Sequence, residues 1–226
     1  MTIKVFIVLP FSIILMNEVK GRIEQKADEL FRRYGIRSIT MDEIANQLGI
    51  SKKTIYHTFA DKDELVDEVI SKILLYNQDR CNKDRLKATN AIHEVFLAME
   101  MIQEMFENMN PAILYDLERN HPQTFKKFQH HKYFYLFEVI KQNIQRGKKE
   151  ELYRADVNTD VVTKVRLETM MLPFNQEIFP KSKFNLVDLQ KQLIEYYLFG
   201  IASLKGYRLI LKYQQESLKK AHQDEN

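Results

Sequence analysis

Apolar residues recur every three or four positions along most of the chain, the spacing that places side chains on one face of a helix. The first such run ends near Gly35, and its apolar positions are Ile23, Ala27, Leu30, Phe31 and Tyr34. Glycine commonly ends a helix because it adopts backbone angles that other residues avoid. The pattern therefore predicts a first amphipathic helix that ends near Gly35.

Three polar segments are typical of helix starts. Thr40-Met41-Asp42-Glu43 and Asp61-Lys62-Asp63-Glu64 are capping boxes, in which the first side chain accepts a hydrogen bond from a backbone N–H of the first turn. Ser51 offers the same kind of cap between them. These caps predict a second helix that ends at Gly49, a short third helix, and a long fourth helix with an apolar face.

The third helix carries an unusual mixture of side chains in the sequence SKKTIYHTF, residues 51–59. Ile55 and Phe59 lie four positions apart, so both are expected to face the protein. The lysines, hydroxyl groups, histidine and tyrosine around them are then exposed to differing degrees. This segment is too polar for a core and too aromatic for an ordinary solvated surface, which predicts a partner outside the chain.

Longer helices are predicted beyond a polar stretch, NQDRCNKDRLK at residues 77–87, which we interpret as a hinge or domain boundary. The patterns cover approximately residues 88–109, 121–146, 157–172 and 186–219, and a further helix begins at Pro111. Six glycines and five prolines are few for 226 residues, and no stretch alternates as a strand would. We predict an all-α fold of about nine helices.

Composition excludes several classes of function. A net charge of +3 is too small to identify a partner. A single cysteine, Cys81, cannot form an internal disulfide, and the histidines lack metal-ligand spacing. The recurrent phosphate-loop and hydrolase motifs do not occur. We therefore expect no enzymatic activity, no metal and no cofactor, and a reducing cytoplasmic location.

The first residues, MTIKVFIVLPFSIIL, could be misread as a targeting segment. Pro10 interrupts the apolar run, no small-residue cleavage site follows, and the run is shorter than the roughly 20 residues that a membrane-spanning helix needs. Our hypothesis is that residues 1–16 are a mis-assigned start, with translation from Met16, or a disordered arm. The mass of the intact native protein distinguishes a start at Met1 from one at Met16.

Three small or apolar residues between the second and third helices have steric roles. Ala45 allows a close helix crossing, Gly49 supplies a positive φ in a tight turn, and Ile55 anchors the third helix on the first two. This spacing indicates a helix-turn-helix, whose second helix can enter a DNA major groove. The flanking caps and the preceding amphipathic helix strengthen this interpretation.

The segment DELFRRYGIRSITMDEIANQLGISKKTIYHTFADKDELVDEVI, residues 28–70, resembles the DNA-binding region of the TetR family of bacterial transcription regulators. The resemblance covers residues 17 to about 75 and is most specific in Gly-Ile-Ser-x-x-Thr-Ile-Tyr-x-x-Phe. It implies a helix-turn-helix DNA-binding domain at residues 17–80 and a larger helical ligand-binding and dimerisation domain at 81–226. The remainder of the chain agrees with the family only in its helical architecture.

The predicted DNA contacts lie on and around the third helix: Thr40, Ser51, Lys52, Lys53, Thr54, Tyr56, His57, Thr58 and Lys62. The resemblance implies phosphate contacts for Tyr56 and Lys62 and a backbone contact at Thr40. The family often has a small residue at position 53 and an aromatic one at position 58, where this chain has Lys53 and Thr58. The alternative is a solvated helix face, and for His57 an incidental surface histidine.

A ligand pocket is predicted in the larger domain, where methionine and phenylalanine follow helical spacing. Methionine adapts to irregular space, so such an interior suits an apolar or aromatic effector. The candidate lining residues are Phe96, Met99, Met105, Phe134, Phe137 and Met170. Glu100, Glu168, His93 or Arg166 could orient the ligand, and the alternative for each is a surface or structural role.

A dimer interface is predicted on the last long helix and the one before it. Apolar residues cover a wide face there, and Gly200 allows close approach of a partner backbone. The candidate residues are Val161, Val165, Leu189, Leu193, Tyr197 and Gly200. The family resemblance implies dimerisation in the same place, and the alternative is packing inside one subunit.

These observations together predict a ligand-responsive regulator that binds a palindromic double-stranded DNA operator as a homodimer and represses transcription. The expected partners are operator DNA, a second copy and a small apolar or aromatic effector, with no membrane. The expected location is the bacterial cytoplasm, at the nucleoid. The alternative is a protein- or ligand-binding adaptor whose helix-turn-helix does not regulate transcription, and a steep inverse salt dependence of DNA binding would separate the two.

Overall fold

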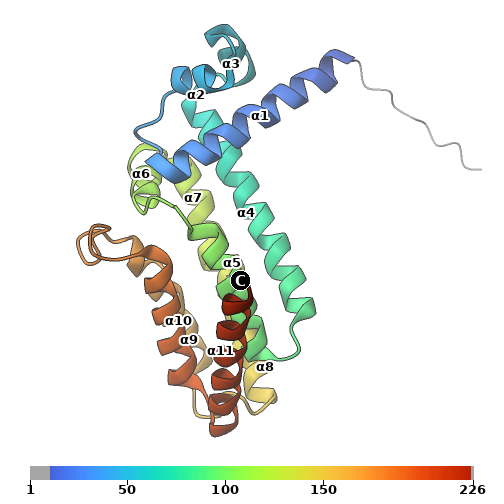
Figure 1. Ribbon diagram of the computed structural model, residues 1–226, viewed down its shortest axis with the longest axis vertical. Coiled ribbons are helices and arrows are strands. Elements are labelled where there is room, and N and C mark those ends of the chain that lie inside the picture. Colours follow the sequence, from blue (N-terminus) through green and yellow to red (C-terminus); the bar gives the residue numbers. More distant parts are fainter. Residues whose placement is uncertain (1–10, 225–226) are drawn as a thin grey trace, which may run out of the picture.

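The computed structural model describes residues 11–224, and this part of the chain forms an elongated body of α-helices (Figure 1). Eleven α-helices, one π-helical turn and one 3-10 turn follow one another in the described residues. The predicted all-α class is confirmed. None of the helices in residues 11–224 is both long and apolar enough to cross a membrane.

The first four helices are α1 (Phe11–Tyr34), α2 (Met41–Leu48), α3 (Lys52–Thr58) and α4 (Lys62–Lys87). The predicted caps are present: Thr40 accepts from the Glu43 N–H at 3.1 Å, Ser51 from Thr54 at 3.1 Å, and Asp61 from Glu64 at 2.8 Å. Each bond satisfies a backbone donor of a first turn that has no partner within its helix. Local sequence therefore determines where α2, α3 and α4 begin.

Gly49 is in the left-handed region, with φ of 65°, and the following Ile50 N–H donates to the Ala45 carbonyl at 3.0 Å. A side chain with a Cβ rarely adopts this backbone conformation, which is the reason for glycine at the turn. Ala45 and Ile55 are both fully buried. The steric roles predicted for these three residues fit the observed turn between α2 and α3.

Buried residues of α1 to α4 form one hydrophobic core, and α6 (Ile113–Asn120) contributes Ile113 and Leu117 to it. A second core lies among α5 (Ala91–Phe106), α8 (Phe137–Lys149), α10 (Leu186–Ile201) and α11 (Leu204–Asp224). The remaining helices are α7 (Pro122–His130) and α9 (Thr159–Thr169). Figure 1 places α2 and α3 at one end of the body and α8 and α11 toward the other.

The predicted hinge at residues 77–87 is wrong, because α4 continues through it to Lys87. Several of its polar residues form ion pairs, including Arg80 with Glu104 at 2.8 Å and with the buried Asp84 at 3.3 Å. A helix whose charged side chains form ion pairs has a polar sequence there, although the helix continues without a break. One continuous helix thus joins the two cores.

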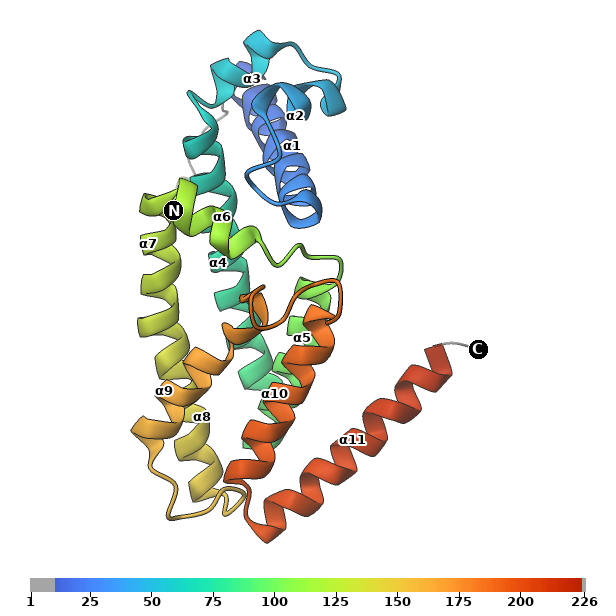
Figure 2. The ribbon, with the colours of Figure 1, turned by 90° about the vertical axis from the view of Figure 1, so that its left-hand side faces the viewer.

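Two further helical patterns are interrupted. The predicted helix at residues 121–146 contains a π-helical turn, η1 (His131–Leu136), between α7 and α8. The pattern at 186–219 breaks at Ala202 and Ser203, where Tyr153 and Ala202 form an isolated antiparallel bridge. Figure 2 shows α11 turning away from α10 after this break. A short 3-10 turn, η2 (Leu172–Phe174), follows α9.

The predicted N-terminal arm falls partly outside the structural description. Residues 11–16 belong to α1, and residues 1–10 lie outside the described part of the chain. Translation from Met16 therefore stays a prediction.

Candidate functional site

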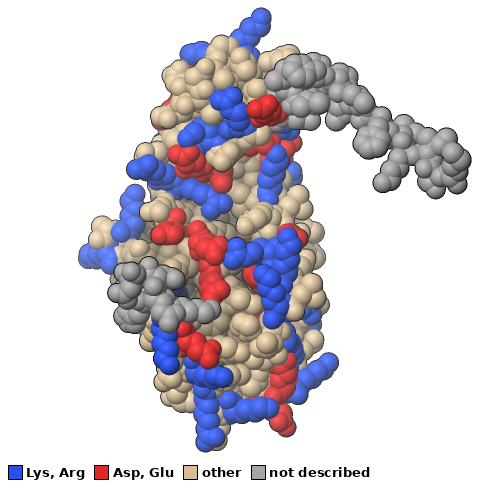
Figure 3. Space-filling model, turned by 45° about the vertical axis from the view of Figure 1, so that its right-hand side comes forward, with Lys and Arg blue, Asp and Glu red and all other residues tan. Residues whose placement is uncertain are grey.

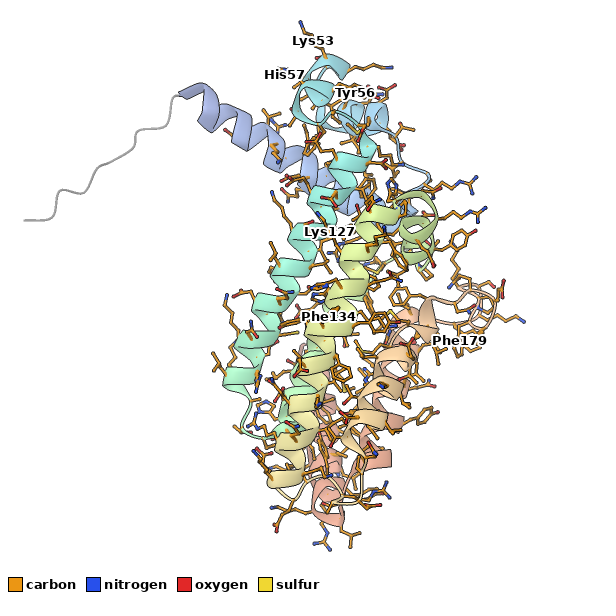
Figure 4. The ribbon with its side chains drawn as sticks, turned by 180° about the vertical axis from the view of Figure 1, so that it is seen from behind. Lys53, Tyr56, His57, Lys127, Phe134 and Phe179 are labelled. Atoms are coloured by element: carbon orange, nitrogen blue, oxygen red, sulfur yellow. The ribbon has the colours of Figure 1, made fainter. Side chains whose placement is uncertain are left out.

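The exposed side of α3 lies at the outer end of the molecule. Ile55 and Phe59 are 0% and 1% exposed, whereas Tyr56 is 49% exposed and Lys53 and His57 also face outward. Figure 4 shows Lys53, Tyr56 and His57 together at this end. The helix therefore divides into a buried apolar side and an exposed polar side, as its sequence predicts.

The three lysines near α3 differ in what they bind. Lys52 forms an ion pair with Asp42 at 2.5 Å. Lys62 is half-buried, donates to the Ile36 carbonyl at 2.6 Å, and has its pKa lowered by burial. The Lys53 side chain makes no hydrogen bond or ion pair with any other described residue. Lys53 is thus the lysine best placed to reach an external anion, while Lys62 already holds α4 to the turn after α1.

The hydroxyl groups predicted to contact DNA already make hydrogen bonds within the chain. Thr40 and Ser51 cap α2 and α3, Ser51 Oγ also lies 2.8 Å from Thr54 Oγ1, and the Thr58 hydroxyl donates to the Thr54 carbonyl at 2.9 Å. A capping oxygen keeps a lone pair and a proton for an external group. These four residues stay predicted contacts, and within the chain their hydrogen bonds help to fix α2 and α3.

Charge on the surface is mixed rather than uniformly basic. Residues 20–65 hold nine Lys or Arg and eight Asp or Glu, and the net charge of the chain is +3. On the face shown in Figure 3, Lys and Arg side chains project from the end that carries α3, and both signs alternate over the middle of the body. Affinity for an anionic partner must therefore depend on individual side chains such as Lys53 more than on a broad field.

A cavity of about 250 Å³ is bordered by residues of eight α-helices, α1 and α4 to α10. Most of its lining is apolar, with Ile73 and Leu74 from α4, Met101 and Met105 from α5, and Ile140 from α8. An engineered apolar cavity of about 150 Å³ is large enough to bind benzene. The cavity here can hold a larger apolar molecule.

Of the six residues predicted to line a pocket, Met105 and Met170 do so. Phe96 and Met99 pack in the second core instead. Phe134 is 63% exposed and stacks on His130, and Phe137 lies beneath Lys141. The π-helical turn explains the last two, because its extra residue rotates the side chains that follow relative to an α-helix. The predicted placement of those four residues is therefore wrong.

Arg166 is the one candidate orienting residue that reaches the cavity; it is 6% exposed and borders the lining. Glu168 forms an ion pair with Lys132 at 2.9 Å, Glu100 is exposed, and His93 stacks on Tyr213. Sequence reasoning missed Gln190, which also borders the cavity and is 1% exposed. Gln190 lies four residues from both Leu186 and Ile194, so the sequence places its polar side chain on an apolar helical face. That spacing is the signal from which it could have been predicted.

The residues predicted for a dimer interface separate into two groups. Val161 and Val165 are 55% and 56% exposed, Gly200 is exposed, and Leu193 is partly exposed. Leu189 is buried within the subunit, and the ring of Tyr197 lies 5.5 Å from the Arg166 guanidinium and borders the cavity. The apolar face predicted from the sequence is too wide to belong to one interface. One side of it packs inside the subunit, and the other side is exposed.

A set of hydrogen bonds joins the turn after α1 to the α5–α6 segment. Asp116, which is buried on α6, accepts from the Arg37 N–H at 2.9 Å. Arg32 donates to the Met105 carbonyl at 3.1 Å, and the Asn110 N–H donates to the Arg32 carbonyl at 2.6 Å. These bonds link α5 and α6 to α1 and to the turn that follows it.

Asp116→Ala should lower the free energy of unfolding by about 1.5–3 kcal/mol, because it removes a charged hydrogen-bond acceptor from a buried junction. Exchange of the Arg37 amide hydrogen should become faster. Denaturant unfolding and hydrogen exchange measure the two effects. Glu118→Ala, an exposed change on the same helix, is the control, and equal behaviour of the two variants would contradict a linking role for Asp116.

Comparison with known proteins places the first unit in a defined family. The model of the tetR family of bacterial regulatory proteins matches residues 23–69, which comprise the second half of α1, all of α2 and α3, and the start of α4. The HTH-type transcriptional repressor KstR2 of Mycobacterium tuberculosis is 36% identical over 59 residues, 26% of this chain and 30% of KstR2. The solved structure of KstR2 superposes on this one with a TM-score of 0.59, and the match covers 83% of this chain and 96% of the KstR2 chain. Residues 23–69 therefore form a DNA-binding region of the TetR type.

Other relatives match more of the chain than residues 23–69. The uncharacterized HTH-type transcriptional regulator YhgD of Bacillus subtilis is 30% identical over 112 residues, so the match spans 49% of this chain and 51% of YhgD. A putative transcriptional regulator from Saccharomonospora viridis, solved in complex with choline, has a TM-score of 0.69 at 18% identity and covers 83% of this chain and 99% of its own. The chain thus matches about half the length of YhgD and less of KstR2 in sequence, and the structural likeness concerns the fold.

Proposed function

We propose that the protein binds a palindromic double-stranded DNA operator as a homodimer and represses transcription. The observation that carries this proposal is α3, whose exposed Lys53, Tyr56 and His57 project from the end of the body while Ile55 and Phe59 hold the helix in place. Lysine can bind phosphate or guanine, and the tyrosine hydroxyl can bind phosphate. The family match of residues 23–69 and the regulators among the protein's relatives support the same function.

A dimer would place two copies of α3 in successive major grooves, roughly 34 Å apart. The exposed Val161 and Val165 on α9, with Gly200 on α10, offer an apolar surface for the second copy. Such a surface can bury apolar area and let a partner helix approach closely at glycine. The expected operator therefore has two half-sites related by a two-fold axis.

The effector would act through α4, because this helix belongs to both units. Leu65 and Val66 lie in the first core, while Ile73 and Leu74 border the cavity. A ligand that fits only one position of α4 would favour the corresponding distance between the two copies of α3. We propose that an apolar ligand in the cavity favours the position that does not fit the operator.

To test the proposal, DNA duplexes that bind the protein are selected from a random pool and from the DNA upstream of the gene. The protein's binding site on the selected duplexes is then mapped by footprinting. Lys53→Ala combined with Tyr56→Ala should lower the affinity for DNA by about 100-fold. The double variant should also reduce the salt dependence of this affinity, because binding with fewer phosphate contacts releases fewer counterions. Fluorescence anisotropy at several salt concentrations measures both. Lys126→Ala, an exposed lysine on α7, should leave affinity unchanged.

A footprint with two symmetric half-sites supports the dimeric regulator. Failure to select any sequence, or equal affinity of wild type and the double variant, would contradict DNA binding through α3. Affinity without sequence preference would favour the adaptor alternative.

A further inference from the structure

The charged groups that border the cavity are paired, with one exception. Arg32 pairs with Asp28 at 2.7 Å, Asp84 with Arg80 at 3.3 Å, and Glu94 with Arg146 at 3.1 Å. His131 also borders the cavity, and burial lowers its pKa to about 4, so that it is neutral at ordinary pH. Among the described residues that border the cavity, Arg166 is the charged side chain without an ion pair.

The guanidinium of Arg166 is unusually poorly compensated for a buried charge. Its side chain is buried, and Nη1 is inaccessible and has no hydrogen-bond partner among the described residues. The ring of Tyr197, 5.5 Å away, gives the cation its main electrostatic support. Burial lowers the Arg166 pKa to about 10, which still leaves the group charged near neutral pH. A buried charge of this kind is costly unless a partner of opposite sign binds it.

A second residue that borders the cavity also has a buried polar atom without a partner among the described residues. Gln190 donates through Nε2 to the Met170 carbonyl at 2.7 Å, and its Oε1 is buried without a hydrogen bond among the described residues. The Met170 N–H in turn donates to the Arg166 carbonyl at 3.1 Å. Arg166 on α9 and Gln190 on α10 are thus both hydrogen-bonded to Met170, which follows α9. Both residues border the cavity. Arg166 therefore adds an unpaired positive charge to a cavity whose lining is mostly apolar.

We propose that the cavity binds an apolar molecule with a single anionic group, a carboxylate, and that Arg166 binds this group. The proposal specifies the effector of the function proposed above and rests on it. A planar guanidinium matches a carboxylate with two parallel hydrogen bonds. One unpaired positive charge balances one negative charge, whereas a phosphate dianion would need a second cation. The apolar lining accounts for the rest of the ligand.

The first test uses three probes with the same ten-carbon chain: decanoate, decan-1-ol and decyltrimethylammonium. They differ in the charge of the head group and are titrated calorimetrically into the purified full-length protein near neutral pH. Decanoate should bind about 10- to 100-fold more tightly than decan-1-ol, as expected for a charged hydrogen-bonded pair. Decyltrimethylammonium should bind more weakly than the alcohol because it places a second positive charge beside Arg166.

Variants assign the preference to Arg166. Arg166→Met keeps an unbranched side chain without the charge, so decanoate should lose about 10- to 100-fold in affinity while decan-1-ol binds as well or better. The variant should fold at least as stably as wild type, because it removes an uncompensated buried charge. Met170→Leu, which changes the lining without changing charge, should alter the affinities for decanoate and decan-1-ol by the same factor.

The proposal would be overturned by a wild-type protein that binds none of the probes, by equal affinity for all of them, or by a decanoate preference that persists in Arg166→Met. The wild-type series decides the matter even if the variant does not fold. Operator affinity, measured in parallel with and without decanoate, tests the proposed function separately. Charge-selective binding without any effect on operator affinity supports the assignment of Arg166 and contradicts the effector role.

Discussion

Phe59→Ala is expected to lower the free energy of unfolding by about 3–5 kcal/mol, the usual cost of removing a buried phenylalanine ring. Phe59 is 1% exposed and packs in the core formed by α1 to α4. Its deletion would leave a cavity beneath α3, whose seven residues depend on Ile55 and Phe59 for their position. Urea unfolding followed by circular dichroism measures the change.

Tyr56→Ala is the matched control for this prediction, because it removes a ring of similar size from the exposed side of the same helix. Its effect on the free energy of unfolding should stay within about 0.5 kcal/mol. Comparable destabilisation by the two variants would mean that α3 does not divide into an anchoring side and a contacting side.

Gly206→Ala should lower the free energy of unfolding by about 3 kcal/mol, although alanine normally favours a helix over glycine. A Cβ at Gly206 would lie 2.0 Å from the Leu152 carbonyl oxygen, and a backbone atom cannot move aside as a flexible side chain can. The Ser203 N–H donates to this same carbonyl at 2.9 Å. The substitution therefore forces α11 away from the loop between α8 and α9.

Gly21→Ala provides the opposite expectation within a helix of the same chain. A Cβ at Gly21 meets nothing within 4 Å, so the change should raise stability by about 0.5–1 kcal/mol through helix propensity. Thermal and urea unfolding of both variants test the pair. A stable Gly206→Ala protein would show that the contact between α11 and Leu152 can relax.

The elements predicted best from sequence are those whose signals are local. Thr40, Ser51 and Asp61 cap helices through bonds to residues three positions ahead, and Gly49 ends α2 through its own backbone angles. These interactions depend on neighbours in sequence, so the first unit and the exposed side of α3 could be predicted without knowledge of the fold. Family resemblance then supplied the roles proposed for Tyr56 and Lys62.

The parts predicted worst depend on contacts between distant segments. The extra residue in η1, which moves Phe134 to the surface, has no signal in helical periodicity. Lys62 reads as a surface lysine, but the Ile36 carbonyl binds it. The sequence around Arg166 does not distinguish it from other arginines. Its lack of an ion pair depends on how α9 and α10 pack around the cavity. Periodicity predicts which residues share a face but does not identify what that face meets.

The continuity of α4 limits how this protein can be recombined with its relatives. A chimera cut at residue 80, where the polar stretch suggests a boundary, would divide a helix that runs from Lys62 to Lys87. The first unit also takes Ile113 and Leu117 from α6 into its core. A transplant of α1 to α3 alone would leave both of these apolar surfaces to be matched by the new host. An engineered sensor that retains this cavity and acquires a new operator should therefore exchange side chains on the exposed side of α3 rather than exchange whole domains.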